Sequence, residues 1–358
     1  MEQQASKAKI KKWVFQYGLS FLIMVAIVYF TFAILLKQYA WHEIKHSLAF
    51  TNIPLFILAF ALIFVHQSCL ASNLKMLLAR FSGVKIPFGV AFQSVMLGFY
   101  FNNITPSTSG GQPMQIYYLF RRGIHIAHSC LVFIAMSFYY YIAMYIYTGL
   151  TFIFDYNRVM ASLGYMHYFL IIGLIINIGI GLFCYFVVYQ PQCLRFVAKG
   201  VLWLLLKSKL FRHPMRLKRA VAKFLKNYAD DSSSIKKDFK VAIRMLLTCL
   251  LQVGSLFSIP FAVCVALGAK ASLSFFLRSF GLQSVLYMST SALPTPGAVG
   301  ITESGFITMF ESVLPKEMVM PAMILTRIIN LYGFLLIAAC FTLWAFTFSI
   351  RKPLKQPK

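Results

Sequence analysis

Six apolar runs, each long enough to cross a bilayer, constrain this chain more than any other feature of its sequence. They cover about residues 14–36, 52–74, 127–154, 166–189, 241–268 and 318–350. A hydrocarbon core needs roughly 20 apolar residues of helix, and lipid offers no partner to a free backbone N–H or C=O group. Because 59% of the residues are hydrophobic and only 12% are charged, the sequence predicts an all-α polytopic membrane protein.

The distribution of positive charge predicts how these spans are oriented. The sequence carries 34 Lys and Arg residues against 9 Asp and Glu residues. If the amino terminus is cytoplasmic, and six full spans are combined with two re-entrant hairpins, then 27 of the 34 basic residues fall in cytoplasmic segments. This asymmetry follows the positive-inside rule. We therefore expect one multi-pass domain of the cell membrane over residues 1–358, with both termini cytoplasmic. In an alternative arrangement each hairpin crosses fully, which gives eight spans.

Two clusters of helix-breaking residues interrupt further apolar sequence. The first hairpin, residues 87–120, contains T-P-S-T-S-G-G-Q-P at Thr105–Pro113; the second, residues 273–314, contains T-P-G-A-V-G-I-T-E-S-G at Thr295–Gly305. Irregular backbone at membrane depth must be buried in protein or line a polar cavity. The clusters therefore indicate two broken-helix hairpins at a site where something polar is handled.

An offset of 190 residues aligns the two clusters and predicts an internal repeat. Gly110 then falls on Gly300 and Gln93 on Gln283. Chance is the rival explanation, since short matches arise easily in biased composition. Three full spans separate the hairpins, so the first enters from the cytoplasm and the second from outside. Inverted broken-helix repeats that meet near mid-membrane are typical of transporter sites.

Two connecting segments also carry predictions. A short loop with Asp155 and Arg158 is expected between the spans at 127–154 and 166–189. Residues 190–240 contain thirteen Lys or Arg residues among apolar ones. This segment suits an amphipathic helix on the anionic inner leaflet, and it equally suits a solvated cytoplasmic linker.

The broken helices point to an anion as ligand. The amino end of a half-helix presents free amide groups at the positive end of its dipole, which favours phosphate or carboxylate. Glycines there permit close approach of a ligand, although they equally permit tight packing of the hairpins. The candidate substrate-binding residues in the motifs, with Arg121 just after the first of them, are Thr105, Pro106, Gly110, Gly111, Gln112, Pro113, Arg121, Thr295, Pro296, Gly297 and Gly300.

Arg327 and Glu303 are the sharpest single candidates. Arg327 lies in the apolar sequence M-I-L-T-R-I-I-N-L-Y. An arginine at the bilayer centre costs at least ~2.5 kcal/mol, so it needs a partner. Glu303 and a ligand phosphate are both possible partners, and a purely structural Arg–Glu pair is the alternative. Asn330, one turn further on, is expected near Arg327 and completes the candidate site.

Other polar residues suggest less. Several polar side chains in apolar runs are interpreted mainly as contacts between helices: His66, Gln67, Gln93, Asn102, Asn103 and Gln283. The seven cysteines are scattered without a C-x-x-C pair, so we expect neither a disulfide framework nor a metal site. We expect no cofactor, and the absence of a Walker motif argues against direct use of ATP.

The two motifs, together with T-R-I-I-N-L-Y, resemble the lysylphosphatidylglycerol synthase transmembrane-region family. These are flippase-like membrane domains, including the flippase half of the multiple peptide resistance factor MprF. The resemblance covers nearly the whole chain. It implies a lipid-translocating domain, and its motifs assign functional roles to Gly110, Gly111, Pro113, Pro296, Gly297, Gly300, Glu303 and Arg327.

This sequence departs from the family pattern in two places. Gln112 stands where Glu is frequent and Gln115 where a basic residue is frequent, which puts the head-group preference in doubt. No aminoacyl-transferase sequence follows Lys358, so we expect the chain not to synthesise its own lipid.

Three functions remain open from the sequence. The leading one is a flippase for a phosphate-bearing lipid, whether amino-acylated, glycosylated or polyprenyl; Arg327 and Arg121 would hold the phosphate. The second is an integral-membrane enzyme that acts on lipid-linked substrates. The nine acidic residues of the sequence offer few candidates for the general acids and bases that such an enzyme needs. The third is an accessory protein that binds a lipid-modifying enzyme through residues 190–240. Expected partners are a phospholipid or lipid-linked substrate, the anionic inner leaflet, and a second copy or a partner enzyme, but no nucleic acid.

Overall fold

The computed structural model describes residues 51–81, 83–105, 109–190, 238–291, 293 and 296–346, together with positions 192, 194–196, 199–200, 221–222, 225 and 228. The predicted first span at 14–36, most of the basic segment 190–240 and the sequence after residue 346 lie outside the described residues. So do Pro106, Ser107 and Thr108 of the first motif and Thr295 of the second.

The described chain is helical, and no strand occurs in it. Five helical segments are long and apolar enough to cross a membrane. They are α3 (Ile53–Phe81), α6 (Ile126–Leu163), α7 (Met166–Tyr189), α10 (Phe239–Ala266) and the continuous run of α13 (Lys316–Arg327), the π-helical turn η3 (Ile328–Tyr332) and α14 (Gly333–Trp344). Each overlaps a predicted span, so the predicted all-α polytopic architecture is confirmed.

The loop predicted around Asp155 and Arg158 is wrong. Helix α6 continues through both residues to Leu163, with one non-helical residue at Asp155 (φ −139°, ψ 31°). At about 1.5 Å per residue a helix of 38 residues outreaches a hydrocarbon core of about 30 Å, so its carboxyl-terminal turns can carry charge outside the lipid. Arg158 pairs there with Asp155, with Nη1 3.6 Å from Oδ1.

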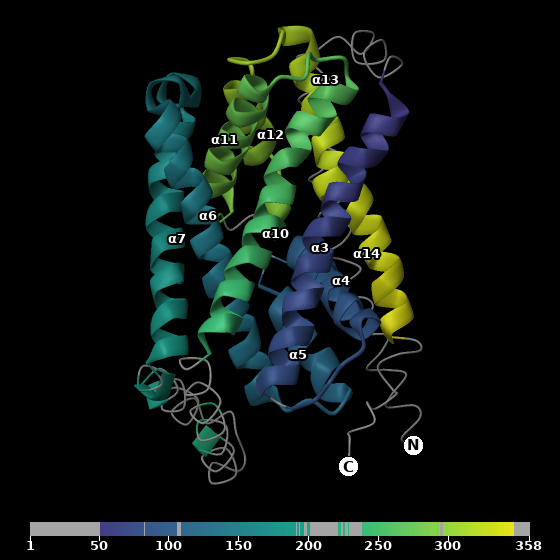
Figure 1. Ribbon diagram of the computed structural model, residues 1–358, viewed down its shortest axis with the longest axis vertical. Helices are drawn as coiled ribbons and strands as arrows, with labels where there is room; N and C mark the ends of the chain where they lie inside the picture. The colour runs from purple at the N-terminus through teal and green to yellow at the C-terminus, as the bar shows by residue number, and fades with distance from the viewer. Residues whose placement is uncertain are drawn as a thin grey trace.

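Helices α3 and α10 form an antiparallel pair that is joined at both ends. At one end the Asn52 amide donates to the Ala266 carbonyl at 2.7 Å. At the other, Arg80 Nε lies 2.9 Å from Asp238 Oδ2, and this hydrogen bond lowers the pKa of Asp238. The two helices lie side by side at the centre of the bundle in Figure 1. Because they are joined at both ends, they form one rigid side of the bundle.

Two helices are broken at the predicted motifs. The first pair is α4 (Phe88–Ile104) and α5 (Gly111–Arg121); the second is α11 (Leu273–Thr290) and α12 (Ile301–Phe310). In Figure 1, α4 and α5 occupy the lower part of the bundle, whereas α11 and α12 occupy the upper part. The offset of 190 residues carries Gly111 onto Ile301, the first residues of α5 and α12. The two broken elements therefore approach each other from opposite ends.

Helix α7 fixes the end of α11 and turns its other face outward. A Cβ on Gly173 would lie 2.4 Å from the Met288 carbonyl oxygen, so only glycine permits this approach. Asn177 donates from Nδ2 to the same carbonyl at 3.1 Å and accepts from the Ser291 hydroxyl at 3.3 Å. The opposite face exposes large apolar side chains such as Ile175, as expected of a helix in contact with lipid.

Candidate functional site

A polar cavity of about 390 Å³ lies where the two interruptions meet. From the first broken element Asn103 reaches it at the end of α4, and from the second Gly297 reaches it within the 3-10 turn η2 (Pro296–Ala298). A Cβ on Gly297 would lie 3.5 Å from Asn103 Oδ1. The irregular backbone thus lies beside a polar space. This is expected because lipid cannot form hydrogen bonds with free backbone N–H and C=O groups.

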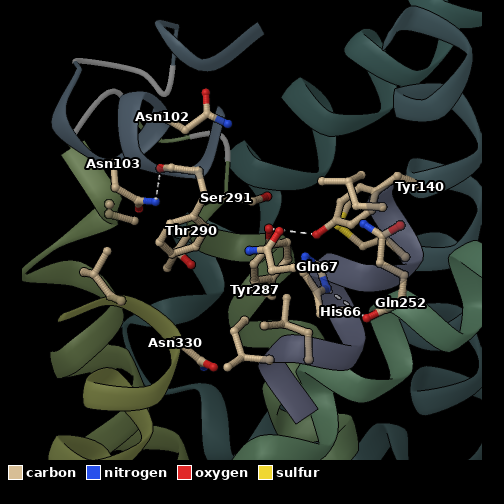
Figure 2. Close-up of a pocket in the computed structure, with 18 of the residues that line it drawn as sticks. His66, Gln67, Asn102, Asn103, Tyr140, Gln252, Tyr287, Thr290, Ser291 and Asn330 are labelled. Carbon is tan, nitrogen blue, oxygen red and sulfur yellow. Dashed lines mark hydrogen bonds between the residues drawn. The ribbon is translucent and has the colours of Figure 1, made fainter. Parts of the chain in front are cut away.

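Carboxamides are the most frequent polar side chains on the wall of this cavity. Eight of them line it: Gln67, Asn102, Asn103, Gln112, Gln115, Gln252, Gln283 and Asn330. Figure 2 shows Asn102 and Asn103 at the upper left, Asn330 at the lower left, and Gln67 from α3 and Gln252 from α10 farther to the right. In five of the eight the side-chain oxygen is buried without a hydrogen-bond partner among the described residues: Gln67, Gln115, Gln252, Gln283 and Asn330. Buried carboxamides are normally satisfied, so this concentration indicates a site made for a hydrogen-bonding guest.

Tyrosines and a histidine complete the polar wall. The Tyr140 hydroxyl donates to the Tyr287 hydroxyl at 2.8 Å, which links α6 to α11 across the cavity. His66 Nδ1 lies 2.9 Å from the Gln252 carbonyl oxygen, so α3 is tied to α10 at this level. Tyr141 also faces the space. These hydrogen bonds therefore join helices that are far apart in the sequence, and together they fix the cavity wall.

Arg327 and Glu303 form a buried ion pair behind the cavity. Arg327 Nε donates to Glu303 Oε1 at 2.6 Å, and the Tyr332 hydroxyl donates to the same oxygen at 2.8 Å. A terminal guanidinium nitrogen, Nη2, donates to the Gly297 carbonyl at 3.0 Å. Glu303 is fully buried, whereas Arg327 is 9% exposed and lines the cavity. Glu303 therefore holds Nε and Gly297 holds Nη2, and the Tyr332 ring centroid lies 5.8 Å from the guanidinium carbon.

The π-helical turn η3 gives this pair its third partner. The Gly333 amide donates to the Ile328 carbonyl, a bond that spans five residues. A Cβ on Gly333 would lie 2.8 Å from that carbonyl oxygen, so glycine is required where the turn closes. The turn places Tyr332 against Glu303 and Asn330 on the cavity wall. π-Turns inside α-helices are frequent at functional sites.

The half-helix amides are less available than the sequence suggested. The Gly111 amide donates to Asn102 Oδ1 at 2.9 Å, and the Gly110 amide donates to Thr105 Oγ1 at 2.9 Å. In the second motif the Gly300 amide donates to Glu303 Oε2 at 2.6 Å. Side chains of the protein therefore occupy these three amides, and a ligand anion would have to use other donors. This corrects the expectation that they are free.

The glycine pair of the first motif serves packing. A Cβ on Gly111 would lie 2.5 Å from the Gly98 carbonyl oxygen and 2.1 Å from Asn102 Oδ1. A Cβ on Gly110 would lie 2.6 Å from a Thr105 side-chain carbon. Both glycines allow α5 to fold tightly against α4, so the packing alternative holds for this pair. In the second motif Gly297 itself lines the cavity.

The candidates from the sequence divide into three groups. Four line the cavity: Gln112, Gly297, Arg327 and Asn330. Five support it from behind: Thr105, Gly110, Gly111, Gly300 and Glu303. Two others lie elsewhere: Arg121 is exposed at the end of α5 and Pro113 is exposed on α5, and neither lines the cavity. For Pro296 only the backbone is described.

Sequence reasoning underestimated the polar residues of the spans. His66, Gln67, Asn102, Asn103 and Gln283 line the cavity, although they were expected to serve mainly contacts between helices. For Gln93 that expectation is confirmed, because its Oε1 accepts from the Tyr118 hydroxyl at 2.8 Å.

Gln252, Tyr140 and Tyr287 carried no motif and were not predicted. The sequence did contain one signal for Gln252, which is the number of carboxamides in its apolar runs. Each carboxamide is costly to bury without a hydrogen-bond partner, so their number indicates a polar site.

Two comparisons with known proteins bear on this site. The family described as the lysylphosphatidylglycerol synthase TM region matches residues 17–338, which is most of the chain. A UPF0104 membrane protein of Archaeoglobus fulgidus is 24% identical in an alignment of 312 residues that covers 83% of this chain and 87% of that protein. The family match extends over both broken elements and the cavity between them.

Proposed function

Because this chain belongs to the lysylphosphatidylglycerol synthase TM region family, a lipid-related family of membrane proteins, we propose that it moves a phosphate-bearing lipid between the leaflets of the cell membrane. One observation carries the proposal. A cavity of about 390 Å³, whose described wall carries eight carboxamides and one arginine among apolar and aromatic side chains, lies inside a bundle whose outer helices expose apolar side chains. Its volume falls within the range of small-molecule sites and suits a head group rather than a whole lipid.

In the proposed mechanism the head group enters the cavity while the acyl chains stay in lipid. Arg327 Nη1 would take the phosphate, since Nε and Nη2 are held by Glu303 and Gly297. A pre-oriented guanidinium loses little entropy on binding and forms strong charge-assisted bonds to phosphate. Thr302, on the wall at the start of α12, adds a hydroxyl on the positive end of that helix.

We further propose that the two broken elements are re-entrant and that both termini are cytoplasmic. Helices α4 and α5 have 17 and 11 residues, and α11 and α12 have 18 and 10. Helices α5 and α12 are too short to cross the hydrocarbon core alone, which favours re-entrant hairpins over pairs of full spans. We propose a transporter rather than an enzyme because Glu303, the acidic residue that lies nearest the cavity among those that the structure describes, is already bound by three partners.

A vesicle assay tests the proposed transport. The purified full chain is reconstituted into phosphatidylcholine vesicles that contain fluorescent phosphatidylglycerol, and dithionite is added to bleach the label of the outer leaflet. We expect bleaching to proceed from the outer-leaflet fraction to nearly all of the label. Ser137→Trp, which fills the cavity from α6, should remove this effect, whereas Ser274→Trp on an exposed position should not. Bleaching that stops at the outer leaflet in the presence of folded protein would refute the proposal.

A further inference from the structure

The described part of the cavity wall carries no acidic side chain. Of nine acidic residues in the sequence the structure describes five: Asp155, Asp238, Glu303, Glu311 and Glu317. None of these five lines the cavity. Glu303 lies nearest, but it is fully buried, with Oε1 bonded to Arg327 and Tyr332 and Oε2 bonded to the Gly300 amide. Among the described residues, no carboxylate is left for a cationic guest.

This distribution of charge disfavours a head group that carries an ammonium group. A cation in this cavity would face Arg327 without a counter-ion, and burial of an unpaired charge is unfavourable. Tyrosine faces attract cations, but less strongly than a carboxylate does. The hydroxyls of Tyr140 and Tyr287 are moreover already bonded to each other at 2.8 Å.

The carboxamides instead match a guest with many hydroxyl groups. A carboxamide offers donors and an acceptor, and a hydroxyl group can both donate and accept. Gln67, Gln252 and Gln283 are each at least nine-tenths buried on the cavity wall, and the oxygen of each lacks a partner among the described residues. In the view of Figure 2, Gln67 and Gln252 lie on one side of the space and Asn330 on another. A polar guest would therefore meet such groups from several directions.

We propose that the head group is an uncharged polyhydroxylated group, glycosyl or cyclitol, joined to the lipid through a phosphate. The phosphate lies at Arg327, and the ring hydroxyls bond to the carboxamides of α3, α10 and α11. This inference rests on the proposed transport function and selects the neutral, hydroxylated class among phosphate-bearing lipids.

A comparison of the translocation rates of three labelled lipids tests the inference in the full protein. Fluorescent phosphatidylinositol, phosphatidylglycerol and lysyl-phosphatidylglycerol are compared in the dithionite assay. We expect phosphatidylinositol to move fastest and the lysyl lipid to move slower by on the order of tenfold or more, because of the unpaired ammonium group. If the lysyl lipid moves as fast as phosphatidylinositol, the head-group inference is wrong although transport stands. If none of the three moves, the proposed function itself fails.

A charge variant gives a second readout in the opposite direction. Gln252→Glu introduces a carboxylate of nearly the same shape on the wall. It should raise the rate for the lysyl lipid relative to phosphatidylinositol. Gln190→Glu, at the exposed end of α7, adds the same charge away from the cavity and should leave the ratio unchanged. An unchanged ratio in Gln252→Glu, in folded protein that still transports, would overturn the inference.

Discussion

Replacing Arg327 by methionine is expected to abolish lipid translocation and to lower the free energy of unfolding by about 3–5 kcal/mol. The substitution leaves the Glu303 carboxylate fully buried with only the Gly300 amide and the Tyr332 hydroxyl as partners. An uncompensated buried charge is costly, and Nη1, the proposed phosphate ligand, is lost at the same time. Thermal unfolding in detergent and the vesicle assay measure the two effects separately.

A double variant separates stability from transport. Arg327→Met combined with Glu303→Gln removes both charges, and most of the lost stability should return because a neutral pair needs no counter-charge. Transport should remain absent. Arg158→Met, the same change on an arginine whose side chain is 69% exposed, should alter neither measurement. Transport by the folded double variant at the normal rate would show that Arg327 does not hold the phosphate.

Gln283→Leu is expected to have the reverse signature, with stability preserved or increased and transport strongly reduced. The Gln283 side-chain oxygen is buried without a partner among the described residues, so its removal should raise the free energy of unfolding by about 1 kcal/mol. The same removal takes a hydrogen-bonding group from the cavity wall. Binding sites commonly lower the stability of the ligand-free protein, because their polar groups are arranged for the ligand and not for packing.

Gln93→Leu is the matched control for this variant. Gln93 is the residue that the repeat aligns with Gln283, but its Oε1 accepts from the Tyr118 hydroxyl at 2.8 Å. Loss of that acceptor should lower the free energy of unfolding by about 1–3 kcal/mol. If Gln283→Leu destabilises the protein as much as Gln93→Leu does, then Gln283 serves packing and not a ligand.

The parts of the fold that depend on local sequence could be predicted. The described spans follow from apolar length, and the breaks after α4 and α11 follow from clusters of Pro and Gly. Arg327 was expected to have a partner because a buried arginine is costly, and Glu303, one of the two partners considered, lies 2.6 Å from it. The end of α6 was missed because Asp155 and Arg158 resemble a polar loop, whereas the helix continues through both residues to Leu163.

The composition of the cavity wall could not be predicted, because it depends on which face of each helix turns inward. Gln67 and Gln252 come from helices that are packed together only by the tertiary fold, and no motif surrounds either of them. The aligned pair Gln93 and Gln283 shows the difficulty, since one serves packing and the other lines the cavity. The occupied amide of Gly111 likewise depends on Asn102, nine residues earlier, folding back on it.

The position of a bound lipid tests the central claim most directly. The protein would be placed in a nanodisc containing phosphatidylinositol, and its structure determined by electron cryo-microscopy. The account predicts density for the head group between α4 and η2, with the phosphate within hydrogen-bonding distance of Arg327 Nη1. Lipid density confined to the outer apolar faces, with ordered water alone in the cavity, would contradict it.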